Sequence, residues 1–264
     1  MQVDIERYIA ASARVDTTDI DWQAAADAGL SEDEQFVLTY FADQENQTIR
    51  YLRMLLGMRI ALRPDVAAFL STWSYEEFFH GYELERMMKS CGGAVADDRR
   101  DALTEGKRLN EYIEAALIPV LSATFKSQFP AVYMAFGAIQ ELTTLRGYEH
   151  ISERTQNPVL KTLCDRIAKQ ERRHFAWYFN NARVLLAESR VAQRLTRGLL
   201  AFNWVPVGAG THSPQDVHRL FQVLFHPAPH AGEVMREIDE KMASLPGMEG
   251  LALMQGYFSK HGLI

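Results

Sequence analysis

Two glutamate and histidine pairs share one spacing in this sequence. Each reads Glu-x-x-His: Glu77 is followed by His80, and Glu171 is followed by His174. Residues three apart on an α-helix lie on the same face, with their Cβ atoms about 5–6 Å apart, so both side chains of a pair can reach one metal ion. Carboxylate and imidazole together are ligands for divalent transition metals. Each pair therefore predicts part of a metal site.

A further glutamate precedes each pair at a similar distance. Glu45 stands 32 residues before Glu77, and Glu141 stands 30 residues before Glu171. The chain thus contains a long repeat, in which a glutamate is followed by Glu-x-x-His. The two glutamates without a following histidine can complete or bridge a pair of ions. The repeat predicts six metal ligands, namely Glu45, Glu77, His80, Glu141, Glu171 and His174.

All four glutamates fall on apolar faces of predicted helices. Glu45 shares its face with Phe41 and Ile49, for example, and Glu141 shares its face with Leu145. Burying an unpaired carboxylate costs several kcal/mol, and no Lys or Arg lies on the same faces to neutralise the charge. Two divalent ions would balance four carboxylates, with the histidines as neutral ligands. A shell rich in carboxylates suits iron or manganese better than zinc.

The hydropathy pattern predicts an all-α chain. Apolar residues recur at steps of three and four, and these steps predict helices at about 31–58, 65–89, 97–125, 130–154 and 158–189. Ser31 and Glu34 form a capping box, and Asn157 before Pro158 is a typical N-cap. A loop at 203–213 precedes one short helix, and two more are expected in 230–262.

Four of these helices carry the six ligands, as in ferritin-like carboxylate proteins. We therefore predict a ferritin-like four-helix bundle with additional N- and C-terminal helices. Residues 1–264 would form one domain. The metal-binding core would occupy about 31–190, and accessory helices would occupy about 213–262.

Composition excludes several classes of protein. The 264 residues are 47% hydrophobic and carry a net charge of −6, which argues against a nucleic-acid binder. No run of about 18 apolar residues is present, so we expect no membrane span. The N-terminus lacks the basic and apolar regions of a secretory signal. The two cysteines, Cys91 and Cys164, do not make a disulfide framework. The expected location is the cytoplasm.

The motifs around the ligands resemble those of the soluble acyl-acyl-carrier-protein desaturases, a family of the ferritin-like di-iron superfamily. The resemblance covers about residues 30–190. In the last motif the family has an acid where this chain has Gln170, which bears on the hydrogen bonding around the metals. The matching residues are Glu76-Glu77-Phe78-Phe79-His80-Gly81, then Gln140-Glu141 with Thr144, and Gln170-Glu171-Arg172-Arg173-His174.

The resemblance implies a specific activity and specific partners. It implies two iron ions, O₂-dependent desaturation of a fatty acyl group on an acyl carrier protein, a ferredoxin-type electron donor and a homodimer. It also implies a catalytic role for Thr144, whose hydroxyl would guide a proton to bound oxygen. The residues alone leave a second interpretation open, in which this hydroxyl bonds the carbonyl four residues earlier.

Two other functions remain open, and the first of them would use the same six ligands. One is a different di-iron oxygenase, such as an N-oxygenase, a hydroxylase or an aldehyde-deformylating enzyme. The other is a ferritin-type iron store, which the chain length and the extra C-terminal helices disfavour.

Two further features of the sequence have more than one interpretation. Tyr148 and Tyr178 stand one or two turns from ligands and are either electron relays or ordinary core aromatics. On the helix of Glu171, four basic residues face away from the metal ligands. They form either a docking strip for an acidic carrier protein or an ordinary solvated face. These residues are Arg166, Lys169, Arg172 and Arg173.

Overall fold

The described part of the chain is helical throughout its regular elements. The structure is a computed structural model that describes residues 4–93, 95, 122–225 and 230–262. The predicted all-α fold, a bundle of helices, is confirmed. The helix predicted at about 97–125 lies almost entirely outside the described residues. The elements are α1 (Ile5–Ala10), α2 (Trp22–Ala28), α3 (Glu32–Leu56), the 3-10 helix η1 (Arg59–Leu62), α4 (Pro64–Ser90), α7 (Phe129–Arg154), α8 (Pro158–Ala187), α9 (Arg190–Asn203), α10 (Pro214–Phe225), α11 (His230–Ala243) and α12 (Leu253–Lys260).

The predicted capping residues start α3 and α8. The backbone N–H of Ser31 donates to Oε2 of Glu34 at 2.8 Å, and the N–H of Glu34 donates to Oγ of Ser31 at 3.2 Å. At α8, Oδ1 of Asn157 accepts from the N–H groups of Val159 and Leu160, at 3.0 and 3.2 Å. These bonds satisfy N–H groups that have no partner within the helix. Both helices therefore begin where local sequence predicts.

Proline and glycine set the limits of α4. Pro64 occupies its first turn, where the missing N–H costs nothing and the fixed φ suits a helix. The helix ends at Ser90, and Gly92 follows with a φ of +76°. That left-handed conformation is one that glycine adopts without strain. The predicted stop at the Gly92-Gly93 pair is confirmed.

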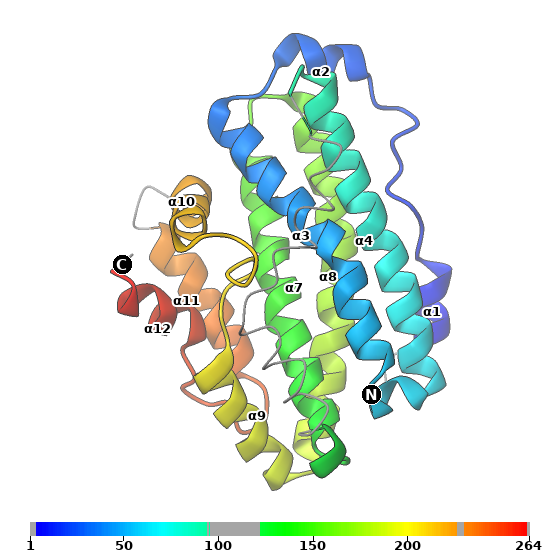
Figure 1. Cartoon of the computed structure of the whole chain (residues 1–264), viewed down its shortest axis with the longest axis vertical. Coiled ribbons are helices and arrows are strands. Elements are labelled where there is room, and N and C mark those ends of the chain that lie inside the picture. The colour runs from blue at the N-terminus through cyan, green and yellow to red at the C-terminus, as the bar shows by residue number, and fades with distance from the viewer. Residues whose placement is uncertain (1–3, 94, 96–121, 226–229, 263–264) are drawn as a thin grey trace. The chain divides into compact units, whose positions relative to one another are not determined.

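The chain divides into two compact units, and the division passes through α7 and α8, each of which is one continuous helix. The first unit contains α1 to α4 and residues 147–170. Within it, α3 and α4 run side by side over much of their length, and α1 and α2 pack against α4 (Figure 1). The second unit contains residues 120–146 and those from 171 onward. Within it, α11 packs against α10 and α12.

Two glycines of α7 allow close contact with aromatic rings. A Cβ added at Gly147 would lie 2.5 Å from Cζ of Phe41 on α3. A Cβ added at Gly137 would lie 2.3 Å from Cδ1 of Tyr178 on α8. Both distances are far below van der Waals contact, so only glycine fits without rearrangement. Each glycine lies one turn or two from Glu141, and close packing therefore surrounds this ligand's helix.

One detail of the predicted apolar face of α3 is wrong. Ile49 is 56% exposed, although it was expected to share a buried face with Glu45. Thr48 and Leu55 take the buried positions instead, at 7% and 3% exposure. The buried stripe advances by four residues from Phe41 to Glu45 and then by three, as the 3.6-residue turn of a helix requires.

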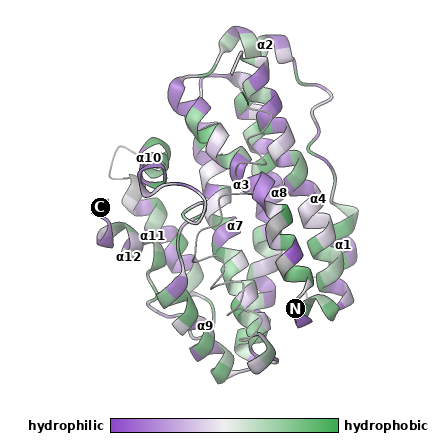
Figure 2. Cartoon of the chain, in the orientation of Figure 1, coloured by the Kyte–Doolittle hydropathy of each residue, from purple (hydrophilic) through white to green (hydrophobic). Residues whose placement is uncertain are grey.

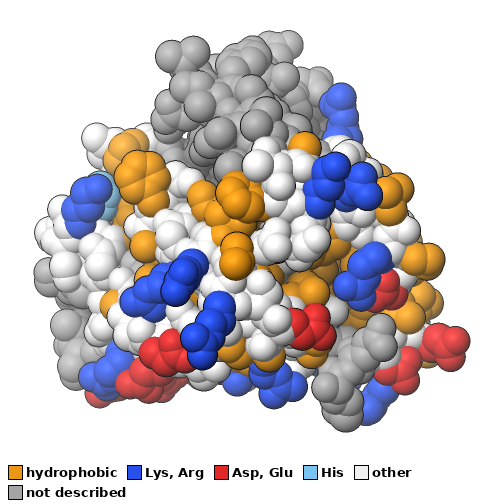
Figure 3. All heavy atoms as spheres, turned by 90° about the horizontal axis from the view of Figure 1, so that it is seen from below, with side chains coloured by type: hydrophobic (Ala, Val, Ile, Leu, Met, Phe, Trp, Pro, Cys, Tyr) orange, Lys and Arg blue, Asp and Glu red, His pale blue; other side chains and the backbone are white. Residues whose placement is uncertain are grey.

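Polar and apolar residues are mixed along the helices. Figure 2 shows hydrophilic and hydrophobic colours on each of the long helices. Among the helices of the described residues, none has both the length and the apolar character needed to cross a membrane. The face drawn in Figure 3 exposes hydrophobic side chains among Lys and Arg side chains.

Candidate metal centre

The six predicted ligands are all buried on long helices. Each is at most 6% exposed, although four of them are carboxylates. Long helices bury such residues only where something compensates the charge. Glu45 lies on α3, Glu77 and His80 lie on α4, Glu141 lies on α7, and Glu171 and His174 lie on α8.

The imidazole of His80 is held between two acceptors. Nδ1 lies 3.0 Å from Oε2 of Glu77, and Nε2 lies 2.8 Å from Oε1 of Gln170. The Gln170 amide donates from Nε2 to the carbonyl oxygen of Ala13 at 2.8 Å, so its oxygen must face His80. Nε2 of His80 therefore donates to Gln170, and Nδ1 faces the carboxylate of Glu77. A metal ion could therefore bind to Nδ1 and to this carboxylate together.

His174 faces two carboxylates. Its Nδ1 lies 3.3 Å from Oε2 of Glu171 and 3.6 Å from Oε2 of Glu141. The imidazole itself is fully buried. One ring nitrogen near two carboxylate oxygens could form part of a divalent ion site.

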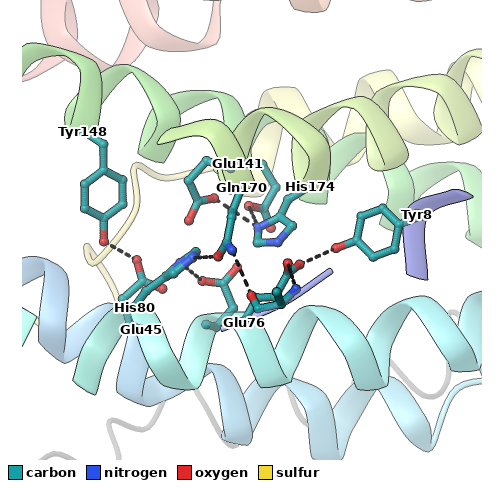
Figure 4. Close-up of polar contacts among 11 residues, drawn as sticks. Tyr8, Glu45, Glu76, His80, Glu141, Tyr148, Gln170 and His174 are labelled. Carbon is teal, nitrogen blue, oxygen red and sulfur yellow. Dashed lines mark hydrogen bonds and ion pairs between the residues drawn. The ribbon is translucent and has the colours of Figure 1, made fainter. Parts of the chain in front are cut away.

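Glu45 is hydrogen-bonded by a tyrosine. The hydroxyl of Tyr148 donates to Oε1 of Glu45 at 2.6 Å, as Figure 4 shows. Tyr148 is fully buried, and its ring lies 4.7 Å from the ring of Phe41 and 6.5 Å from that of His80. Two interpretations of Tyr148 were open from the sequence, and neither included this bond. The contact joins residues 103 apart in the chain, which no local pattern reveals.

The N-terminal segment contacts the residue next to a ligand. Glu76 is fully buried and accepts a hydrogen bond from the hydroxyl of Tyr8 at 3.0 Å and one from the N–H of Ala13 at 3.3 Å (Figure 4). Ala13 therefore bonds both Glu76 and Gln170 through its backbone. Sequence reasoning missed this role because backbone groups leave no side-chain signal.

The ligand atoms form two groups that could each hold a metal ion. Within a group, the carboxylate oxygens and imidazole nitrogens lie within 4.8 Å of one another. Glu77 and Glu171 belong to both groups. One group consists of Glu45, Glu77, His80 and Glu171, and the other consists of Glu77, Glu141, Glu171 and His174.

The donor types fit iron or manganese. The two groups together offer four carboxylates and two imidazoles and no sulfur. Cys164 lies elsewhere on α8, fully buried, and burial raises the pKa of its thiol. A protonated thiol is a poor ligand, which agrees with the expectation that Cys164 packs as a small apolar residue.

The remaining candidate residues have mixed outcomes. Thr144 lies one turn after Glu141 on α7 and is half-buried. The bond to the carbonyl four residues earlier is made by its neighbour, because Oγ1 of Thr143 donates to the oxygen of Ile139 at 2.7 Å. Tyr178 is buried, and its hydroxyl lies 2.9 Å from that of Tyr133. The catalytic role of Thr144 stays a prediction.

The predicted basic strip of α8 is only partly available. Arg166 forms two bonds with the carboxylate of Asp19, at 2.6 and 2.7 Å. This guanidinium lowers the pKa of Asp19. Lys169 and Arg172 are exposed. Arg173 is half-buried. The four predicted residues therefore differ in exposure, and Arg166 is paired with Asp19.

Comparisons with known proteins found no relative of this chain. No family model matches the chain, and neither a curated protein nor a solved structure matches it.

Proposed function

We propose that this protein is a non-haem di-iron oxidoreductase that uses O₂ to desaturate an acyl chain bound to a carrier protein. The observation that carries the proposal is the pair of buried groups that share Glu77 and Glu171. Burying so many carboxylates has a cost, and two divalent ions balance their charge. Iron bound there would supply the activation of O₂ and the oxidising power for the reaction.

Each ligand has a role in this proposal. Glu45 and His80 would hold one ion, and Glu141 and His174 would hold the other. Glu77 and Glu171, which belong to both groups, would bridge them. Gln170 accepts a hydrogen bond from Nε2 of His80, and Nδ1, on the other side of the ring, would bind the metal.

The surrounding residues would exclude water and guide a proton. Met134, Ala138 and Leu145 lie on α7 near Glu141 and are at most 4% exposed, so this stretch of the helix is dry. A dry site strengthens electrostatic interactions and protects reactive species from side reactions. Thr144 would hold a proton at its hydroxyl, one turn from Glu141.

The partners follow from the same resemblance to acyl-acyl-carrier-protein desaturases. The substrate would arrive on an acyl carrier protein, electrons would come from a ferredoxin-type protein, and the chain would form a homodimer. Carrier proteins of this kind are acidic, and this chain has a net charge of −6. Docking therefore needs a local basic surface. Lys169 and Arg172, both exposed, are the residues we assign to it.

Two measurements test the proposal. Metal analysis after anaerobic reconstitution with Fe²⁺ should find two ions per chain, and fewer than one ion in a folded protein would contradict the centre. Mass spectrometry of acyl-carrier substrates, incubated with O₂ and a reductase system, should then show loss of two hydrogens. Added oxygen in the product would indicate a hydroxylase. Iron oxidation without any change in an organic substrate, in a large shell-like assembly, would indicate an iron store.

Glu141→Ala provides the matched negative control. The variant removes one carboxylate of the second group and should lose O₂-dependent turnover while it keeps its helical circular dichroism. Unchanged turnover would mean that Glu141 is not a ligand. The reversal of charge at Lys169 and Arg172 should raise KM for the carrier-bound substrate without changing kcat.

A further inference from the structure

The ring of Tyr148 packs against two other rings, and its hydroxyl bonds a candidate metal ligand. Its fully buried ring lies between the ring of Phe41, 4.7 Å away, and the ring of His80, 6.5 Å away and edge-on. The preceding residue is Gly147, where any Cβ would meet Phe41. This packing fixes the ring and directs the hydroxyl at Glu45 (Figure 4).

The bond from Tyr148 to Glu45 is a short one to a carboxylate. At 2.6 Å between oxygens, it belongs to the stronger class of hydrogen bonds, in which the acceptor is ionised. The phenol uses one lone pair of Oε1 of Glu45. An ion can bind Oε2 without disturbing that bond, whereas chelation through both oxygens would compete with it. The hydrogen bond therefore favours binding through one oxygen.

The internal repeat of the sequence contains no second residue of this kind. Tyr148 stands seven residues after Glu141, and the position seven residues after Glu45 is Leu52. Leucine has no donor. The two halves thus match in their six ligands but differ at this outer position. The difference predicts that the two ions would not be equivalent.

We propose that Tyr148 positions Glu45 as a one-oxygen ligand and thereby leaves a coordination position open on the ion that Glu45 and His80 hold. The inference rests on the proposed function, because it requires a metal ion in the group that contains Glu45. It deepens that function by assigning the side of the centre at which O₂ would enter. Tyr148 is a positioning residue, since it acts through Glu45.

The test is a titration of the metal-free protein with Co²⁺, whose visible absorption depends on coordination number. In Tyr148→Phe, Glu45 becomes able to bind through both oxygens, so absorption from one of the two ions should weaken as coordination rises. The affinity for Co²⁺ in that binding step should fall by about 10- to 100-fold, as is usual when the hydrogen-bonding partner of a metal ligand is removed. The other step should stay as in the wild type.

Tyr178→Phe is the matched control. Tyr178 is also a buried tyrosine on a metal helix, but its hydroxyl lies 2.9 Å from another tyrosine, Tyr133. We expect this variant to keep the wild-type Co²⁺ spectrum. A double-mutant cycle adds a second control. In a Glu45→Gln background, Tyr148→Phe should have no further effect, because its route through Glu45 is gone.

The outcomes separate the two proposals. Failure of the wild type to bind Co²⁺ would overturn the proposed metal centre and this inference with it. Binding of two ions with an unchanged spectrum and affinity in Tyr148→Phe would overturn the inference alone. Equal changes in Tyr178→Phe, or additive effects of Tyr148→Phe and Glu45→Gln, would also overturn it.

Discussion

The amide oxygen of Gln170 accepts a hydrogen bond from Nε2 of His80 at 2.8 Å, across 90 residues of sequence. The same amide donates to the carbonyl oxygen of Ala13, which fixes its orientation. A neutral acceptor thus stands where the resembling family has an acid. Gln170 orients the imidazole of His80, a candidate metal ligand, without placing another negative charge beside it.

Replacement of Gln170 should therefore weaken metal binding. Gln170→Leu leaves the buried Nε2–H of His80 without its acceptor, and we expect affinity for Fe²⁺ or Mn²⁺ to fall by about 10- to 100-fold. Anaerobic titration calorimetry measures the change. Gln170→Glu is the control, because it keeps an oxygen against His80, and it should bind metal more tightly than Gln170→Leu. Equal affinities in the two variants would show that the hydrogen bond has no effect on the metal.

Glu171→Gln should separate stability from metal binding. Glu171 is 1% exposed and belongs to both groups, so it adds a charge to a crowded buried site. Without metal, the neutral amide should raise the free energy of unfolding by about 0.5–2 kcal/mol, as relief of a destabilised functional site does. The rise in Tm on adding metal should disappear. Thermal melts with and without Mn²⁺ test both statements, and a variant that retains the metal-induced rise would contradict the assignment.

Gly137→Ala should destabilise the protein. The new Cβ would lie 2.3 Å from Cδ1 of Tyr178, and overpacking of this kind costs about 1–3 kcal/mol. Gly198→Ala on α9 is the control, because its Cβ meets nothing within 4 Å. There the substitution should stabilise by about 0.5–1 kcal/mol through helix propensity. Chemical denaturation of both variants measures the difference in sign, and a stable Gly137→Ala would mean that α7 and the ring of Tyr178 can separate freely.

Asp239 should give a defined pH dependence. It is 4% exposed and accepts hydrogen bonds from the N–H groups of Met254 and Gln255, at 2.8 and 3.0 Å. Burial raises its pKa above the ordinary 3.8, so the folded state favours the protonated form. The contribution of Asp239 to the free energy of unfolding is present at low pH and is lost as the pH rises through its raised pKa in the folded state.

Asp239→Asn isolates this contribution, since the amide does not titrate. The unfolding free energy of the wild type, minus that of the variant, should decrease as the pH rises above 3.8. Denaturation curves at a series of pH values measure it. Only the slope of this free-energy difference against pH is diagnostic. The amide also weakens the hydrogen bonds to the first turn of α12, but that effect on the free energy does not vary with pH. A difference that increases with pH would mean that the backbone bonds outweigh burial.

Local sequence patterns are sufficient to predict the long helices α3, α4, α7 and α8 and the candidate ligands that they carry. Ser31 and Asn157 start their helices through bonds to residues two or three positions away. The Glu-x-x-His pairs predicted shared faces for the same reason, since a helix repeats every 3.6 residues. Local patterns therefore suffice to predict the all-α fold and the burial of all six candidate ligands.

The surroundings of the candidate ligands depend on contacts between residues far apart in the chain. The contact between Tyr148 and Glu45 joins residues 103 apart, and the contact between Gln170 and His80 joins residues 90 apart. Such contacts depend on how each helix is rotated about its axis relative to its neighbour, and a rotation by one residue moves a side chain by about 100°. Ile49 is exposed for this reason, although its spacing from Glu45 is helical. Packing of whole helices sets that rotation, and no short segment of sequence contains it.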